Sequence, residues 1–347
     1  MTTRVFKIDE YSIDLEALEF SASVIRDGGL VVFPTETVYG LGADATNYEA
    51  AKKIYAAKGR PSDNPLIVHI SNPSDSEKYT YTNELYYKLA EKFMPGPLTV
   101  ILKSKETVPP ETRGGLDTVA IRCPSNKIAN KLIELSGVAI AAPSANLSGS
   151  PSPTCARHVI DDMDGRVDVI IDGGDSDFGL ESTIVKVNDD NTLTLLRPGK
   201  ITPEELSCIA DVTVDVAVSR ELRNGEVALS PGLKYKHYSP RAEVVLLDGN
   251  AKSAIDYILN IKNKRVAVLA FTENVELFKA HASGAEIFDF GSFFNPGEQA
   301  HKLFSTLREA DKLGCEIIFA PVPKAEGVGL ALYNRMIRAS AHTIIKL

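Results

Sequence analysis

The chain has 347 residues, of which 44% are apolar and 24% are charged, so two soluble globular domains are expected. It contains no apolar run of about 18 residues and no signal-peptide pattern at its start, which predicts a cytoplasmic protein without a membrane span. The net charge of −8 lies mainly in the first 240 residues, which argues against non-specific nucleic-acid binding as the main function.

In chain order, the first two hundred residues predict helices and strands of an α/β domain. Helical spacing of apolar residues predicts helices over 14–26, 47–57, 84–93 and 128–135, and another from about 154. Asn47 is a helix cap in this pattern, and Gly59 is the corresponding stop. The last strands follow one another without helices, so the sheet must be of mixed direction. Short apolar runs predict strands near 30–33, 66–70, 98–102, 118–123, 138–142, 167–171, 182–187 and 192–196.

In the second part of the chain, the apolar residues are spaced differently. After a short helix near 203–209, residues 230–240 contain two prolines and no periodicity, which is typical of a linker. Apolar runs at 244–248, 265–271, 286–290 and 316–321 then alternate with helical stretches, as in a parallel sheet with crossover helices. We therefore predict a mixed-sheet domain over 1–208, a linker over 209–240 and a smaller Rossmann-like domain of parallel βα units over 241–347.

Two polar segments carry several hydrogen-bond donors and no nucleophile paired with a base. They are K-G-R-P-S-D-N-P-L at 58–66 and A-P-S-A-N-L-S-G at 142–149. In the first, Gly59 ends a helix and turns Lys58 and Arg60 toward one side, where they would bind phosphate or carboxylate. The alternative is that both cations only complement the end of the helix dipole. We expect Lys58→Ala to leave the fold intact, because the residue lies near a helix end.

Polar residues also occur at the ends of, or inside, apolar strands. Thr35, Glu36 and Thr37 follow the strand at 30–33, a position where α/β proteins place ligands, although hydroxyls there equally cap turns. His69 interrupts I-V-H-I, which is more typical of a structural histidine. Arg122 in V-A-I-R-C needs an anionic partner if it is buried, and a carboxylate ligand is the interpretation we favour.

In the second polar segment, Ser144, Asn146 and Ser148 alternate directly after a strand. They suit a phosphate or a magnesium-bound water network, or they form a simple side-chain-capped turn. The Asp172–Asp175 stretch, D-G-G-D, resembles a metal loop but is more often a turn. Phosphate-loop, G-x-S-x-G and H-E-x-x-H motifs do not occur, so any nucleotide would bind in an unusual cradle.

Several motifs occur together in an order that resembles a known family. They are F-P-T-E-T-V-Y-G-L-G, K-G-R-P-S-D-N-P-L, L-D-T-V-A-I-R, A-P-S-A-N and F-G-L-E-S-T-I. The same order is found in the YrdC-like family of threonylcarbamoyl-AMP synthases. The later K-Y-K-H-Y-S-P, N-P-G-E-Q-A-H-K-L-F and G-V-G-L-A-L-Y-N-R-M-I-R-A-S resemble the linker and C-terminal domain of that family's two-domain form.

The resemblance implies a reaction and a set of partners. L-threonine, bicarbonate and ATP, with Mg²⁺, would give threonylcarbamoyl-adenylate and pyrophosphate, and the product would pass to the machinery that modifies adenosine beside the anticodon of tRNA. The resemblance implies that threonine is held by Thr35, His69, Arg122, Ser182 and the main chain of Ala142. It implies that the ATP side is lined by Lys58, Arg60, Asn64, Thr118, Ser144, Asn146, Ser152 and Arg197, with Lys58 and Arg60 catalytic, and that Tyr235 and His237 close over the nucleotide.

Two alternatives remain open at this point. A carbamoyl-adenylate-forming enzyme of the hydrogenase-maturation type shares the YrdC-like module, but such proteins carry cysteine-rich zinc fingers. The four cysteines here, at 123, 155, 208 and 315, form no C-x-x-C pair. The other alternative is a double-stranded RNA-binding module, which the acidic composition of the first 240 residues disfavours. Direct RNA contact is therefore not expected as the main function.

Overall fold

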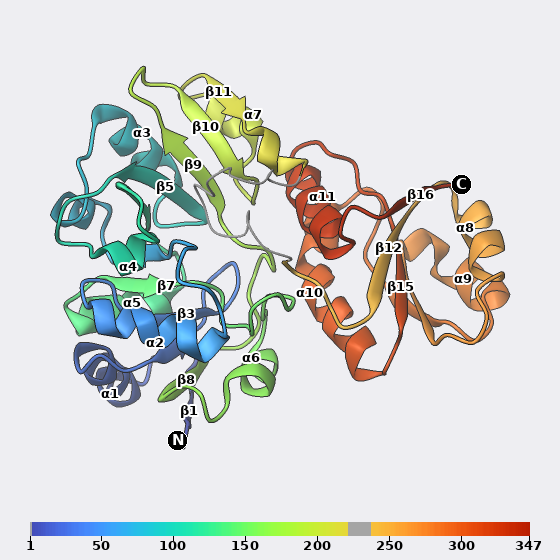
Figure 1. The fold of residues 1–347 in the computed structure, drawn as a ribbon, viewed down its shortest axis with the longest axis horizontal. Coiled ribbons are helices and arrows are strands. Elements are labelled where there is room, and N and C mark those ends of the chain that lie inside the picture. The colour runs from blue at the N-terminus through green and yellow to red at the C-terminus, as the bar shows by residue number, and fades with distance from the viewer. Residues whose placement is uncertain (1, 221–236) are drawn as a thin grey trace. The chain divides into compact units, whose positions relative to one another are not determined.

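The computed structural model describes residues 2–220 and 237–347, which divide into two compact units (Figure 1). The second unit contains the described residues from His237 onward together with Gly149–Pro151 and Phe178–Leu180, and the first unit contains the rest. The α/β class with a large mixed sheet and a second, parallel sheet is confirmed. Among the described helices, none is both long and apolar enough to cross a membrane.

The first unit is built on one sheet of eleven strands, in the order β1-β8-β2-β3-β7-β4-β6-β5-β9-β10-β11. β3 pairs antiparallel with both β2 and β7, and β7 also pairs antiparallel with β4. β4 and β6 pair in parallel, so the sheet is mixed as predicted. The strands are β1 (Arg4–Lys7), β2 (Val31–Phe33), β3 (Gly40–Asp44), β4 (Ile67–His69), β5 (Leu98–Lys103), β6 (Thr118–Arg122), β7 (Ile140–Ala142), β8 (Val169–Asp172), β9 (Thr183–Val187), β10 (Leu193–Arg197) and β11 (Val212–Val214).

The helix over Tyr48–Lys58 begins and ends at the two capping residues that the sequence predicts. Asn47 accepts hydrogen bonds from the N–H groups of Glu49 and Ala50, and Gly59 ends the same helix with a left-handed φ of 61°. The helices are α1 (Leu15–Arg26), α2 (Tyr48–Lys58), α3 (Glu84–Phe93), α4 (Pro110–Arg113), α5 (Lys127–Ser136), α6 (Ala156–Met163) and α7 (Pro203–Ser207), with 3₁₀ turns η1 (Pro73–Lys78) and η2 (Val216–Val218).

Strand β3 was not predicted, and its glycines explain why. The run G-L-G lacks the alternating bulky residues that indicate a strand. A Cβ on Gly42 would lie 2.6 Å from a methyl carbon of Ile140 and 2.7 Å from the Phe33 ring, so glycine allows the neighbouring strands to approach. The neighbouring Tyr39, directly before this run, is fully buried, and its hydroxyl donates to the carbonyl oxygen of Gly174.

Ordered structure also continues beyond residue 208, where a linker was expected to begin. β11 pairs in parallel with β10 through Leu193 and Val212, and η2 follows it, so residues 212–218 lie against the sheet edge. The pattern V-T-V is too short, and too exposed, to be distinguished from a loop in the sequence.

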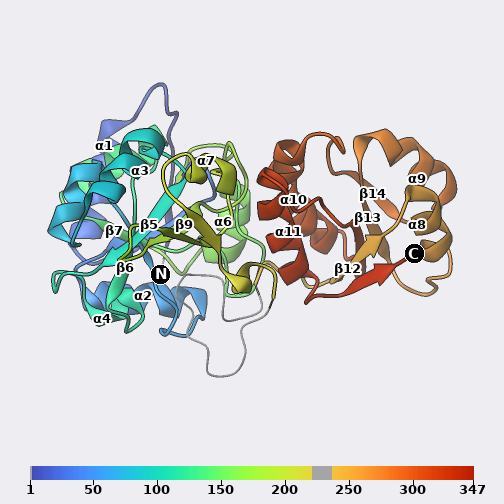
Figure 2. The same cartoon turned by 90° about the horizontal axis from the view of Figure 1, so that it is seen from above.

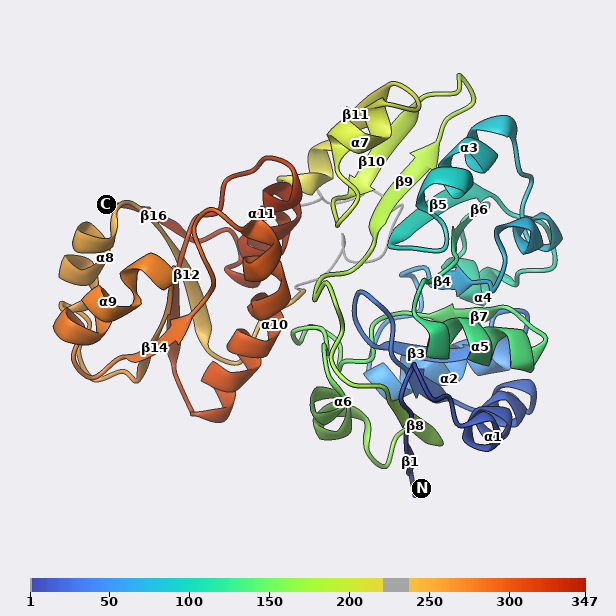
Figure 3. The ribbon, with the colours of Figure 1, turned by 180° about the vertical axis from the view of Figure 1, so that it is seen from behind.

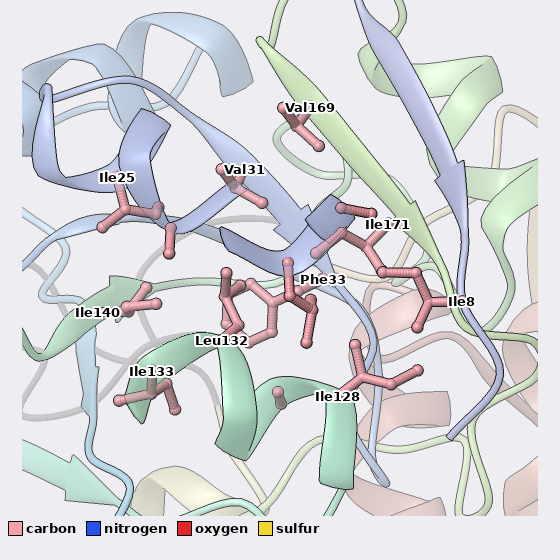
Figure 4. Packing of buried hydrophobic residues seen from close by; sticks show 14 of the residues in the cluster. Ile8, Ile25, Val31, Phe33, Ile128, Leu132, Ile133, Ile140, Val169 and Ile171 are labelled. Carbon is pink, nitrogen blue, oxygen red and sulfur yellow. The ribbon is translucent and has the colours of Figure 1, made fainter. Parts of the chain in front are cut away.

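The main core of the first unit lies between α1, α5 and the strands β2, β7 and β8 (Figure 4). Both helices turn their apolar stripes toward these strands, which is what the helical spacing in the sequence predicts. Each fully buried aliphatic or aromatic side chain contributes on the order of 1.5–3 kcal/mol to this packing. The labelled members are Ile8, Ile25, Val31, Phe33, Ile128, Leu132, Ile133, Ile140, Val169 and Ile171.

The second unit has a sheet of five parallel strands in the order β14-β13-β15-β12-β16. Figures 1 and 2 show this sheet between the helix pair α8 and α9 and the helix pair α10 and α11. This is the predicted Rossmann-like arrangement, extended by one short strand at the end of the chain. Its elements are β12 (Glu243–Asp248), α8 (Ala251–Ile258), β13 (Val266–Ala270), η3 (Thr272–Asn274), α9 (Val275–His281), β14 (Glu286–Asp289), α10 (Pro296–Lys312), β15 (Ile317–Pro321), α11 (Val328–Ala339) and β16 (Ile344–Lys346).

Candidate active site

A row of polar side chains crosses one face of the sheet in the first unit. His69 of β4 is paired with Arg122 of β6, and Arg122 is paired with Thr99 of β5. Directly paired residues on neighbouring strands project to the same face, so these three side chains share one face. Ser182, just before β9, continues the row, because its Oγ lies 2.8 Å from Thr99 Oγ1. Figure 3 shows the strands from β7 through β4, β6 and β5 to β9 that carry this row.

Arg197 and Ala142 lie at the two ends of this row. Arg197 donates from Nε to the carbonyl oxygen of Ser182 at 3.0 Å and from Nη2 to the Ser182 hydroxyl at 3.1 Å. At the other end, Ile140 of β7 is paired with His69, and Ala142 follows Ile140 by two residues on the same face. The structure therefore brings together five residues that the resemblance assigns to two different substrates.

Arg122 is buried and has an acidic partner within the protein. Its Nη2 lies 2.8 Å from Oε1 of Glu36, and both side chains are more than nine-tenths buried. A buried arginine is expected to have an anionic partner, and here a carboxylate of the protein is that partner. The sequence indicated Glu36 as one of the polar residues of T-E-T, but it did not predict the contact with Arg122. Despite the short distance, both Glu36 oxygens and Arg122 Nε and Nη2 lack a hydrogen bond of good geometry to any described residue.

His69 is a neutral imidazole at physiological pH. Its Nδ1 lies 3.1 Å from the carbonyl oxygen of Ile67, and its ring contacts Phe33 edge-on. Burial, and to a smaller extent the nearby Arg122 guanidinium, lower the pKa of His69 to about 3. His69 can therefore donate or accept a hydrogen bond, but it is a poor proton acceptor.

The hydroxyl of Thr35 caps a turn, which was the alternative to ligand binding at this position. Its Oγ1 accepts from the N–H groups of Thr37 at 3.2 Å and Val38 at 3.3 Å, and it donates to the Val38 carbonyl oxygen at 2.6 Å. This network holds the loop that carries Glu36 between β2 and β3. Thr35 is almost fully buried, so this turn lies inside the fold, next to Glu36.

Lys58 joins the two polar segments that the sequence singled out. Its Nζ donates to the carbonyl oxygens of Ser144, at 2.5 Å, and Asn146, at 2.6 Å, and its own carbonyl oxygen accepts from the N–H of Ser148. Lys58 is only 3% exposed, so the interpretation in which it only complements the helix dipole leaves its burial and its two hydrogen bonds unexplained. The expectation that Lys58→Ala leaves the fold intact is also unsupported, because the ammonium group satisfies two carbonyl oxygens.

The other residues of the two segments form short local networks. Arg60 Nη2 donates to the carbonyl oxygen of Asn64 at 3.3 Å, whereas the fully buried side-chain amide of Asn64 makes no hydrogen bond with any described residue. The Ser144 hydroxyl donates to Oδ1 of Asn146 at 2.5 Å. An amide buried without partners is costly, so Asn64 is a group that a polar ligand would satisfy.

Ser152 and Thr118 were also assigned to the ATP side. The Ser152 hydroxyl donates to Oε1 of Glu181 at 2.5 Å, and both side chains are buried. Thr118 begins β6, four residues before Arg122 and on the same face, and is half-buried. Sequence reasoning missed Glu181 and Thr99, although a polar residue inside an apolar strand, as in L-T-V-I-L, is a signal that could have identified Thr99.

Two aromatic residues of the expected linker, Tyr235 and His237, were expected to close over the nucleotide. Tyr235 lies outside the described residues. His237 belongs to the second unit, where its ring lies 5.4 Å from that of Tyr238, which stacks on Phe304.

The described residues offer no preformed metal centre. Within 2–220 and 237–347, no group of three or more His, Cys, Asp or Glu side chains could hold a metal ion. The D-G-G-D stretch is a turn, in which Oδ1 of Asp172 accepts from the N–H of Gly174 at 3.1 Å. Two carboxylates at the row, Glu36 and Glu181, each already contact another side chain.

Comparison with known proteins covers both units. The profile of the Sua5/YciO/YrdC family, described as telomere recombination, matches residues 23–199, and the profile described as threonylcarbamoyl-AMP synthase, C-terminal domain, matches residues 201–341. Threonylcarbamoyl-AMP synthases of Pyrococcus abyssi and Bacillus subtilis are each 42% identical, over 98% and 97% of this chain and 97% of each relative. The crystal structure of Pyrococcus abyssi Sua5 complexed with L-threonine matches with a TM-score of 0.91 and 40% identity, over 99% of this chain and 100% of that chain.

Proposed function

The chain belongs to the Sua5/YciO/YrdC family in its two-domain form, and we propose that it makes threonylcarbamoyl-AMP, as its full-length relatives are named to do. It is an ATP-using enzyme of the nucleotidyl-transfer type that condenses L-threonine, bicarbonate and ATP and releases pyrophosphate. The product serves the threonylcarbamoyl modification of adenosine beside the anticodon of tRNA, through a separate transferase machinery.

The observation that carries this proposal is the convergence of the motifs. Segments that lie up to about 110 residues apart in the sequence supply one row of polar side chains, from His69 through Arg122 and Thr99 to Ser182. Lys58 connects this region to the A-P-S-A-N segment. Such an arrangement can position and neutralise several anionic groups at once, which is what a reaction without a covalent enzyme intermediate requires.

We assign threonine to the row on the sheet face. Arg122 would bind its carboxylate through a bidentate contact, which a guanidinium is suited to form. Neutral His69, the hydroxyls of Thr35 and Ser182 and the main chain of Ala142 would hold the remaining polar atoms of the amino acid. The amino group would then react with bicarbonate to give a carbamate.

We assign ATP to the region around the two polar segments. Lys58 and Arg60 would stabilise negative charge on the phosphates while the carbamate oxygen attacks the α-phosphorus, so no enzyme nucleophile is needed. The residues that would line the nucleotide are Asn64, Thr118, Ser144, Asn146, Ser152 and Arg197, with Tyr235 and His237 closing over it from the expected linker. We further propose that residues 1–208 form the catalytic domain and that residues 241–347 position this linker.

Magnesium would enter with ATP. The scarcity of clustered carboxylates in the described residues fits an ion that is coordinated mainly by phosphate oxygens and water. When bound, Mg²⁺ supplies charge neutralisation at the phosphates.

Pyrophosphate release from ATP tests the proposal directly. We expect release to require both threonine and bicarbonate, and omission of either one to reduce it to background. Arg122→Ala should abolish saturable threonine binding, measured by calorimetry, because Arg122 is the cation in the middle of this row, between His69 and Thr99. Pyrophosphate release that continues unchanged without threonine would overturn the proposed function.

A further inference from the structure

The buried pair of Glu36 and Arg122 places two opposite charges away from solvent at the row of polar side chains. Burying a carboxylate and a guanidinium costs several kcal/mol per ion, which is recovered only with good geometry and further hydrogen bonds. Here the two groups are 2.8 Å apart, but neither Glu36 oxygen forms a well-directed hydrogen bond with a described residue. The pair is therefore poorly satisfied by the protein alone, and a ligand with complementary charges would improve it.

The charges of free threonine complement those of this pair. At neutral pH the amino acid carries a carboxylate and an ammonium group on the same carbon. The carboxylate suits Arg122, and the ammonium group then lies next to the carboxylate that Arg122 has released. The ammonium must also lose a proton before its nitrogen can attack bicarbonate, so the reaction needs a proton acceptor close to this nitrogen.

We propose that Glu36 is this acceptor: the threonine carboxylate displaces Glu36 from Arg122, and the freed Glu36 carboxylate takes a proton from the threonine ammonium. This inference rests on the proposed function and names a catalytic role for a residue that the family resemblance does not assign. An N–H bond of the ammonium breaks, its electron pair stays on nitrogen, and the proton moves to a Glu36 oxygen. The nitrogen then forms a bond to the bicarbonate carbon, and one further amine proton leaves with the bicarbonate hydroxyl as water, which yields the carbamate.

The displacement supplies the required basicity. In the free protein, the carboxylate of Glu36 is occupied by its contact with the Arg122 guanidinium. Once the substrate carboxylate occupies Arg122, Glu36 remains buried without its counter-ion, and desolvation then favours the protonated acid. Substrate binding therefore converts Glu36 from a paired charge to a proton acceptor at the moment when one is needed.

The other titratable groups that face Glu36 are unsuited to this step. Arg122 on β6 is a cation and accepts no proton. Burial and the same arginine lower the pKa of His69 on β4 to about 3, so its imidazole is a weak base. Burial and, to a smaller extent, the charge of Glu36 raise the pKa of the neighbouring Cys123 thiol to about 12, so this thiol remains protonated. The nearby hydroxyls of Thr35, Thr37 and Ser182 are not bases at neutral pH.

The test compares the parent enzyme with Glu36→Gln across a pH series. A general base contributes about 10²–10⁴-fold, so we expect kcat of Glu36→Gln to fall at least 100-fold at pH 7.5, with threonine binding weakened less than kcat. The variant must use threonine that has lost its proton in solution. The ratio of parent to variant rates should therefore fall about tenfold per pH unit as the pH rises from 7 to 9, and taking the ratio cancels the pH dependence of bicarbonate.

Distinct outcomes separate this inference from the proposed function. If the parent releases pyrophosphate without threonine, the proposed function fails. If the parent requires threonine but Glu36→Gln stays within threefold of it, or shows a deficit that is independent of pH, the role of Glu36 as a base is refuted. Should Glu36→Gln not fold, Glu36→Asp keeps the acid. We expect it to retain the parent's pH profile at a lower rate, and a rate that instead rose tenfold per pH unit would contradict the proposal.

Discussion

Lys58 and Arg122 are buried cations of the first unit, and the protein neutralises them in different ways. Lys58 donates to two main-chain carbonyl oxygens, whereas Arg122 faces the carboxylate of Glu36. Carbonyl dipoles leave the Lys58 charge in place, so an anion bound nearby still experiences it. Glu36 instead cancels the charge of Arg122 until a second carboxylate competes for it. A substrate can therefore add to the Lys58 network, but it must replace a partner at Arg122.

Replacing Lys58 should destabilise the fold as well as the reaction. Lys58→Met keeps the length of the side chain but leaves the carbonyl oxygens of Ser144 and Asn146 without this donor. Each buried unsatisfied group costs about 1–3 kcal/mol, so we expect the free energy of unfolding, measured in urea, to fall by about 2 kcal/mol or more. Lys52→Ala on the same helix is the control, because its exposed pair with Glu49 contributes less than about 1 kcal/mol. Equal stability of the two variants would show that the Lys58 contacts contribute nothing.

His69 should make the stability depend on pH below neutrality. Its pKa is about 3 in the folded protein and near the ordinary value when unfolded, so acidification protonates the unfolded chain first. The stability contributed by the neutral imidazole is thus fully present above about pH 6.5 and is lost progressively as the pH falls toward about 3. Between about pH 7.5 and 5.5, the parent should lose about 1 kcal/mol more than His69→Gln does in urea titrations. Parallel losses in both proteins would exclude this coupling.

At the scale of elements, helix ends are where local sequence and observed structure agree best. Asn47 and Gly59 cap α2 as their residue types predict, and Asn83 and Asn126 cap α3 and α5 in the same way. Caps depend on a side chain and the N–H groups two or three residues later, so no distant part of the chain is needed. Gly59 matters further, because its left-handed conformation separates Lys58 from Arg60 at the helix end.

Gly59→Ala isolates the contribution of this helix end. A Cβ at Gly59 would meet no atom within 4 Å, so the cost is that of a left-handed backbone for alanine, about 1 kcal/mol. Gly137→Ala is a matched control, because Gly137 ends α5 with φ 66° and equally open space. We expect both variants to lose similar stability in urea titration, and only Gly59→Ala to slow pyrophosphate release. A rate loss of the same size in Gly137→Ala would mean that reduced stability alone explains the effect.

The strands that the sequence did not predict have a common physical cause. β1, β11 and β16 lie at sheet edges and have few buried residues, so they lack a strong apolar pattern. β3 is central and buried, but its glycines remove the side chains that would mark it. In both cases, strand formation depends on pairing with neighbours that lie elsewhere in the chain.

At the scale of the whole molecule, the chain builds separate cores in its two units. One core lies between α1, α5 and the mixed sheet, and another lies between α8, α9 and the parallel sheet. The change from a mixed order of strands to regular βα alternation near residue 244 is visible in the sequence, because each sheet type imposes its own spacing of apolar runs. Short segments at 149–151 and 178–180 are grouped with the second unit, and nothing in their composition indicates this.

Local patterns were sufficient for the α/β class, most helices and central strands, and the ordered motifs that indicate the family. These properties follow from spacing and residue type over a few turns, and both act between near neighbours in the chain. The contact of Lys58 with carbonyl oxygens 86 and 88 residues away, and the pairing of Glu36 with Arg122, could not be predicted in this way. They depend on strands that are distant in the chain but paired in the sheet: β3, which follows Glu36, pairs with β7, which leads to Ser144, and β7 is joined through β4 to β6, which carries Arg122.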